Sequence, residues 1–138
     1  GVSGLIIPDL PPVEFEKNYQ PILEKYGLNF TFLVTPETSE ERIQYLDSLS
    51  SGFLYAVSSS STTGNENKEV KNDEYLNKLA SINLKNPVMI GFGIKNKTDF
   101  EQVTEKSQGG IIGTAFVKIL LENKDWKEKA EAFIKSIK

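Results

Sequence analysis

The sequence has no cysteine and no histidine among its 138 residues. The lack of cysteine excludes disulfides, thiolate nucleophiles and cysteine zinc sites. The lack of histidine removes the usual general base, the usual metal ligand and every relay in which histidine activates a nucleophile. Acid–base chemistry here must depend on carboxylates, lysine or tyrosine, and no metal site is expected.

Long apolar runs are also missing. The longest, residues 111–121, is interrupted by Gly113, Thr114 and Lys118 and is shorter than the roughly twenty residues that cross a bilayer. No basic segment precedes an apolar one at the start, so no signal peptide is expected. These absences predict a cytoplasmic protein without a membrane partner.

The chain has no excess of positive charge, because 16 Lys and Arg stand against 19 Asp and Glu. Without a basic surplus there is little to neutralise a phosphate backbone, so nucleic acid is not an expected partner. A content of 38% hydrophobic and 25% charged residues is typical of a globular chain. Its length predicts a single domain over residues 1–138.

Five short apolar runs alternate with longer amphipathic segments. Such runs are typical of strands buried on both faces, and they comprise residues 2–10, 30–34, 53–57, 88–90 and 111–112. The first segment between them has helical spacing and ends at Gly27. Strand–helix units in tandem predict a parallel sheet, since parallel neighbours need a crossover.

Capping residues indicate where helices begin. Residues 38–41 and 98–101 each match a capping box, and Asn72 is predicted to cap another helix. Two further helices are expected over residues 115–121 and 126–137.

Two architectures fit this pattern. One is an open, five-stranded, flavodoxin-like sheet, and the other is the C-terminal part of a (βα)8 TIM barrel. Both bind ligands at the carboxyl ends of the strands. The candidate positions at those ends are Asp9, Thr35, residues 58–67, residues 91–94, Gly113 and Thr114.

Glycines end the last two predicted strands, as Gly91-Phe92-Gly93 and Gly113-Thr114. Glycine lets a backbone approach an anion closely, and a helix N-terminus carries about half a positive charge. These turns predict a phosphate site, although the glycines would also suit plain tight turns. A Rossmann fingerprint is not present, because its third glycine and acidic partner are missing.

Residues 58–71 are polar without periodicity and predict a long loop. A lid is favoured over a linker, because the loop interrupts a repeating unit, and Thr63-Gly64 supplies a hydroxyl and a hinge. Asp9 is either an acid–base group or a turn residue. Tyr55 shares one side of its strand with Phe53 and Val57, but the pattern leaves open which side.

Residues 5–11, 62–66, 91–94 and 113–118 together resemble the tryptophan synthase alpha subunit family. Their order and spacing match the fourth, sixth, seventh and eighth strands of that family's barrel. The resemblance implies a carbon–carbon lyase that cleaves indole-3-glycerol phosphate into indole and glyceraldehyde 3-phosphate. It also implies a beta subunit as partner, which uses pyridoxal phosphate, and no cofactor in this chain.

The resemblance also implies roles for individual residues. The family's phosphate contacts fall at Gly64, Gly93, Gly113 and Thr114, with Phe92 between two of them, and its indole pocket falls at Ile6, Leu33, Tyr55 and Ile111. Thr63 falls where the family's mobile loop closes over the substrate. The proline of residues 9–11 falls in the stretch that faces the beta subunit.

The family's catalytic glutamate and aspartate belong to a region that would precede Gly1, so no catalytic residue is expected here. The resemblance therefore implies strands four to eight of such a barrel, inactive alone and prone to self-associate through unpaired sheet edges. The Ser-rich residues 58–62 differ from the family's usual loop. A non-enzymatic phosphate-binding module, or another phosphate-binding barrel, is the alternative.

Overall fold

The computed structural model describes residues 1–57, 66–122 and 124–137, and its strands are all paired in parallel. The strands are β1 (Gly4–Ile6), β2 (Asn29–Thr31), β3 (Leu33–Val34), β4 (Leu54–Ala56), β5 (Val88–Ile90) and β6 (Gly109–Gly110). Only Phe32 separates β2 from β3. The two together form the single run predicted over residues 30–34.

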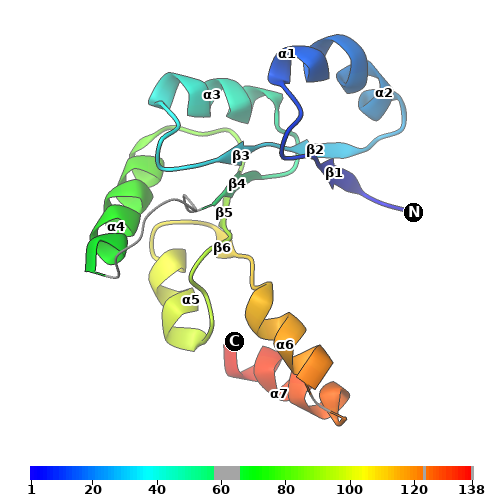
Figure 1. The fold of residues 1–138 in the computed structure, drawn as a ribbon. Coiled ribbons are helices and arrows are strands. Elements are labelled where there is room, and N and C mark those ends of the chain that lie inside the picture. Colours follow the sequence, from blue (N-terminus) through cyan, green and yellow to red (C-terminus); the bar gives the residue numbers. More distant parts are fainter. Residues whose placement is uncertain (58–65, 123, 138) are drawn as a thin grey trace.

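The order of the strands in space distinguishes the two predicted architectures. β1 pairs with β2, and β3, β4, β5 and β6 follow one another as neighbours in chain order. A doubly wound sheet reverses this order at its switch point, whereas a (βα)8 barrel never does. In Figure 1 the helices fan out around the strip of strands. The arrangement is that of a partial TIM barrel and not of a flavodoxin-like sheet.

The helices fill the connections between the strands. They are α1 (Pro12–Glu14), the π-helical turn η1 (Phe15–Tyr19), α2 (Gln20–Lys25), α3 (Glu40–Leu49), α4 (Glu66–Ser81), α5 (Lys97–Thr104), α6 (Thr114–Glu122) and α7 (Trp126–Ile137). The last two agree with the predicted segments 115–121 and 126–137. In the part of the chain that the structure describes, no helix has the length and apolar character needed to cross a membrane.

The core lies between the strands and their helices. Alternate strand residues face it, and Val34, Leu54, Ala56 and Ile90 are fully buried there. Near β1 and β2, the rings of Phe15, Phe30 and Phe32 pack with centroids 4.4–5.1 Å apart. The residues between the buried ones face the opposite side of the sheet.

Proline distorts the first helical segment. Pro21 has no N–H and cannot continue the regular hydrogen-bond ladder, and its ring crowds the preceding turn. The chain widens just before it, so that the Gln20 N–H donates to the Phe15 carbonyl five residues back. The segment ends at Gly27, which has a φ of 64° as its predicted role as a C-terminal stop requires.

The amino end of β5 is tied to α3 by a buried carboxylate. Asp47, only 4% exposed, accepts hydrogen bonds from the backbone N–H groups of Lys85 at 2.6 Å and Asn86 at 3.0 Å. The Asn86 side chain in turn donates to the backbone carbonyls of Asp47 and Ser50. This cluster anchors the loop that leads into β5.

Two predicted strand boundaries are wrong. The first strand is restricted to three of the predicted residues 2–10. The fifth is formed by Gly109 and Gly110 and not by residues 111–112, although the Ile111 N–H still donates to the Ile90 carbonyl at 2.7 Å. A Cβ at Gly110 would lie 2.4 Å from Ile94. Neighbouring side chains thus occupy the space beside this glycine, in a strand where propensity predicts a turn.

The predicted helix starts are also displaced. Ser39 caps α3 by accepting from the Arg42 N–H, while the Thr38 hydroxyl accepts from the Thr35 N–H. Asn96, not Thr98, caps α5. Several neighbouring residues had side chains able to cap, and the path of the incoming chain selects one of them.

The predicted loop over residues 58–71 is too long. α4 begins at Glu66, so residues 66–71 are helical and Asn72 lies within the helix instead of capping it. Their polar composition carries no apolar periodicity, so the sequence pattern did not mark this part of the helix. The predicted lid residues Thr63 and Gly64 lie outside the described residues.

Candidate ligand site at the carboxyl ends of the strands

Two glycine turns are open to solvent at the carboxyl ends of β5 and β6. Gly93 has a φ of 75°, a conformation that favours glycine. A Cβ added at Gly93 or at Gly113 would meet no atom within 4 Å. The backbone at both turns is therefore accessible to a ligand.

The second turn leads directly into α6. The Val117 N–H donates to the Gly113 carbonyl at 3.0 Å, which closes the first turn of this nine-residue helix. Thr114 is exposed at its start. The N–H groups that begin a helix have no partner within it and suit an anion. The predicted phosphate residues Gly113 and Thr114 lie at such an end.

Gly91, in contrast, is closely packed. A Cβ there would lie 1.9 Å from Cε2 of Tyr55, so the tyrosine ring occupies the space over this glycine. Tyr55 is half-buried on β4, next to β5. Its ring fixes where the Gly91-Phe92-Gly93 turn begins.

The predicted indole-facing residues share one face of the sheet. Leu33 pairs in register with Tyr55, and Ile6 lies on β1 with its side chain 44% exposed. Because Gly110 faces Ile94 on the helix side, alternation directs Ile111 to the same face as Tyr55. This face is the one that a closed barrel turns toward its interior.

Met89 is a member of this face that the sequence analysis did not identify. It pairs in register with Tyr55 on one side and with Gly109 on the other. Its position two residues before Gly91 was the available signal, since strand side chains repeat with a period of two.

Phe92 directs its ring away from this face. The ring stacks on Tyr75 of α4, with centroids 6.2 Å apart and planes inclined by 22°. It packs against the core on the helix side. Its backbone therefore remains the part of Phe92 that can reach a ligand between Gly91 and Gly93.

Asp9 is the predicted acid–base candidate at this end of the strands. Asp9 is exposed in the turn after β1, where the Leu10 N–H donates to the Ile7 carbonyl. Within residues 1–57, 66–122 and 124–137, no group of three or more carboxylates is arranged to hold a metal ion. The arrangement is suited to binding an anion through the backbone and an apolar group beside it.

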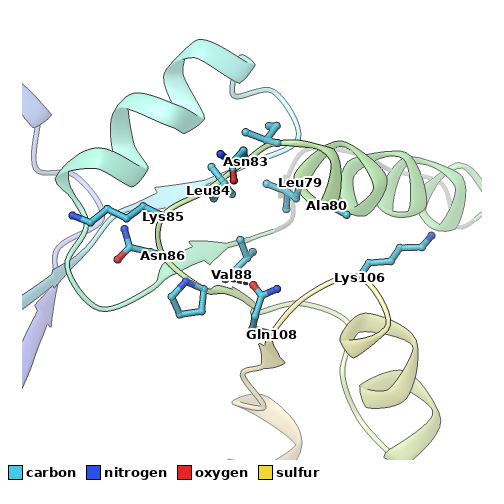
Figure 2. Close-up of a pocket in the computed structure, with 11 residues that line it drawn as sticks. Leu79, Ala80, Asn83, Leu84, Lys85, Asn86, Val88, Lys106 and Gln108 are labelled. Atoms are coloured by element: carbon cyan, nitrogen blue, oxygen red, sulfur yellow. Dashed lines mark hydrogen bonds between the residues drawn. The ribbon is translucent and has the colours of Figure 1, made fainter.

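A cavity of about 360 Å³ lies at the opposite end, near the amino ends of β5 and β6. Figure 2 shows its lining from the end of α4, the loop before β5, Lys106 and Gln108. The Gln108 side-chain oxygen accepts from the Val88 N–H, and Lys106 pairs with Asp73. These polar groups are already engaged in hydrogen bonds and ion pairs within the protein. The cavity is therefore a weaker candidate for a ligand site than the glycine turns at the carboxyl ends of the strands.

Comparison with known proteins identifies relatives over the whole chain. The family model described as tryptophan synthase alpha chain matches residues 1–137. The tryptophan synthase alpha chain of Flavobacterium johnsoniae is 50% identical over 124 residues, which are 89% of this chain and 49% of that protein. That of Christiangramia forsetii is 45% identical over 139 residues, covering 100% of this chain and 54% of its own length.

A solved structure has the same fold. The tryptophan synthase A-subunit of Pyrococcus furiosus is 30% identical with a TM-score of 0.81. The match covers 99% of this chain and 55% of that one. The chain thus spans about half the length of the relatives that it matches.

Proposed function

Because the chain belongs to the tryptophan synthase alpha chain family, we propose that it forms the substrate-binding part of a lyase. That enzyme cleaves indole-3-glycerol phosphate into indole and glyceraldehyde 3-phosphate in the cytoplasm. The proposal concerns the assembled barrel, since the chain spans about half of its relatives. The observation that carries it is the pair of open glycine turns beside an apolar sheet face.

The phosphate end of the substrate binds at the two turns. Backbone N–H groups near Gly93 and at the start of α6 donate to the phosphate oxygens, and the positive end of the helix adds to the attraction. Gly113 keeps the approach free of a side chain, and the Thr114 hydroxyl adds one hydrogen bond. Gly64 would contribute from the segment that precedes α4.

The indole end lies on the apolar face formed by Ile6, Leu33, Tyr55 and Ile111. Removing an aromatic ring from water gains about 25 cal/mol per Å² of buried apolar surface, so this face supplies affinity without charge. Thr63 would close over the bound substrate. The two ends together select a ligand with an aromatic ring at one end and a phosphate at the other.

Cleavage breaks the bond between the indole ring and the glycerol chain. The ring carbon gains a proton, and the neighbouring glycerol hydroxyl loses one as the aldehyde forms. The glutamate and aspartate that the resemblance assigns to these steps belong to the half of the barrel that this chain does not match. The chain alone is therefore expected to bind fragments of the substrate but not to cleave it.

The released indole passes to a beta subunit. The resemblance assigns this contact to the proline of residues 9–11, and Asp9 and Pro11 are both exposed beside β1. Their exposure leaves the segment free for a partner.

Activity of the completed barrel tests the proposal. The chain is co-expressed with the first half of the Flavobacterium johnsoniae alpha chain, and cleavage of indole-3-glycerol phosphate is followed by indole release. The assembled barrel is expected to be active and the chain alone inactive. Turnover by the chain alone, lost on Asp9→Ala or Tyr55→Ala, would contradict the assigned division of roles.

Titration of the same assembly with glycerol phosphate tests the phosphate contacts. Gly113→Val should weaken the binding of glycerol phosphate severely. Thr114→Ala should reduce the binding free energy by only about 1 kcal/mol, which is the scale of one hydrogen bond. Gly52→Ala is the control, because its methyl group would meet Asn29 at an ordinary 3.5 Å. A steep salt dependence that Lys95→Ala abolishes, with Gly113→Val harmless, would favour a surface cation instead.

A further inference from the structure

Tyr75 is a buried aromatic residue to which the family resemblance assigns no role. It lies on α4 and is only 2% exposed. Among the described residues its hydroxyl has no hydrogen-bond partner. A buried hydroxyl without a partner costs free energy, so the contribution of this side chain comes from its ring.

The ring of Tyr75 contacts the turn that carries Gly93. It stacks on Phe92, the middle residue of Gly91-Phe92-Gly93, with a centroid separation of 6.2 Å and an angle of 22°. Offset stacking of this kind stabilises a pair beyond the area that it buries. Phe92 is thereby held against the helix layer.

Gly93 depends on this anchor more than an ordinary turn residue would. Its φ of 75° lies in the left-handed region, and no neighbouring atom would contact a Cβ there. The residues on either side of it along the chain, Phe92 and Ile94, both pack with the core. The preceding one is Phe92, which Tyr75 restrains.

The two ends of this turn are held from opposite faces of the sheet. Tyr55 packs on Gly91 from the inner face, and Tyr75 packs on Phe92 from the helix face. Both tyrosines come from the strand–helix unit of β4 and α4, which precedes the turn along the chain. This unit therefore contacts the Gly91-Phe92-Gly93 turn at two successive residues.

We propose that Tyr75 is a positioning residue for the phosphate-binding turn, acting through Phe92 to orient the backbone of Gly93. The identity of the ligand as a phosphate ester rests on the proposed function. The contact between Tyr75 and Phe92 does not.

Four substitutions separate positioning from general stability. Tyr75→Phe keeps the ring, Tyr75→Leu removes it, and Leu79→Ala damages the core on the same helix one turn further along. Leu79 is 3% exposed and lines the cavity at the other end of the strands, so its loss should lower stability without reaching the turn. Tyr75→Met is a milder second variant that also lacks the ring.

The first measurement is the amide resonance of Gly93 in the isotope-labelled chain within the ligand-free assembled barrel, where both sheet edges are covered. Tyr75→Leu and Tyr75→Met should shift and broaden it, whereas Tyr75→Phe and Leu79→Ala should leave it in place. Equal perturbation by Tyr75→Leu and Leu79→Ala, or none by any variant, would overturn the proposal.

The second measurement is the affinity of the completed barrel for glycerol phosphate. Tyr75→Leu should raise the dissociation constant about tenfold, which corresponds to about 1.4 kcal/mol. Tyr75→Phe should leave the dissociation constant at its wild-type value. If glycerol phosphate fails to bind even the wild-type barrel, the proposed function is wrong, and the amide measurement still decides whether Tyr75 positions the turn.

Discussion

Asp47 and Tyr75 are both buried, but their polar groups are satisfied to very different degrees. The Asp47 carboxylate accepts hydrogen bonds from the backbone N–H groups of Lys85 and Asn86. Among the described residues the Tyr75 hydroxyl has no partner. Polar groups of these two kinds respond in opposite ways when they are removed.

Removing the Asp47 side chain should destabilise the protein. Asp47→Ala leaves the backbone N–H groups of Lys85 and Asn86 without an acceptor, at an expected cost of about 3 kcal/mol in the free energy of unfolding. Glu131→Ala is the control, because its exposed ion pair with Lys135 within α7 should contribute less than about 0.5 kcal/mol. Urea unfolding of both variants measures the difference, and equal midpoints would contradict it.

The stability of the chain should fall at alkaline pH through Tyr75. Burial raises the pKa of Tyr75 above its usual value of 10, and the nearby Glu37 raises it further. Above about pH 10 the unfolded chain therefore releases a proton that the folded chain retains, and stability declines as the pH rises toward the folded pKa.

Tyr75→Phe provides the test of this pH dependence. The variant should be at least as stable as the wild type at neutral pH and should lose less stability between about pH 9 and about pH 11. Denaturant unfolding at several pH values measures both. Parallel stability curves for the two proteins would show that Tyr75 does not carry the effect.

At the scale of elements, the start of each helix is chosen by the geometry of the chain that enters it. For α5, the Asn96 side chain accepts from the Asp99 N–H at 3.0 Å. The Asp99 carboxylate accepts from the Lys95 N–H at 2.9 Å, one residue before the cap, which holds the incoming chain against the start of the helix. Thr98 matches the same sequence pattern but lies inside the helix.

The two candidate caps of α5 are distinguished by substitution. Asn96→Ala should cost about 1 kcal/mol in stability, because the Asp99 N–H loses its acceptor. Thr98→Ala should change stability by less than about 0.5 kcal/mol, as an exposed helix position does. Thermal unfolding compares them, and a larger loss for Thr98→Ala would favour the cap predicted from the sequence pattern.

At the scale of the whole molecule, the strip of strands is open along both edges. Among the described strands, β1 pairs only with β2 and β6 only with β5. Large apolar side chains are also exposed on α6 and α7, with Leu121 exposed by 80%. Open edges and exposed apolar groups both favour association.

The isolated chain should therefore self-associate. Sedimentation should give a mass that rises with protein concentration, and adding the other half of the barrel from a relative should abolish this rise by covering both edges. Ile6→Lys, on the open sheet face, should weaken association without affecting the core. A stable monomer at every concentration would mean that the edges are protected in some other way.

Much of the fold was accessible from local patterns. The alternation of apolar runs with amphipathic segments predicted parallel strand–helix units, because burial on both faces and helical periodicity leave distinct marks along a chain. The glycines at residues 93 and 113 marked the open turns, and the apolar stripe over residues 126–137 predicted α7 with its observed bounds. Strand alternation predicted which side chains share a face with Tyr55, but it left open whether that face is the inner one.

Tertiary contacts decided the remainder. Tyr55 faces the inner side because β5 brings Gly91 beneath its ring. Gly109 and Gly110 form a strand because they pair with Met89 and Ile90 of β5. Propensity and periodicity describe a residue's preference within its own segment. Strand register, cap choice and the stacking of Tyr75 on Phe92 depend on partners far away in the sequence, which only the folded chain brings together.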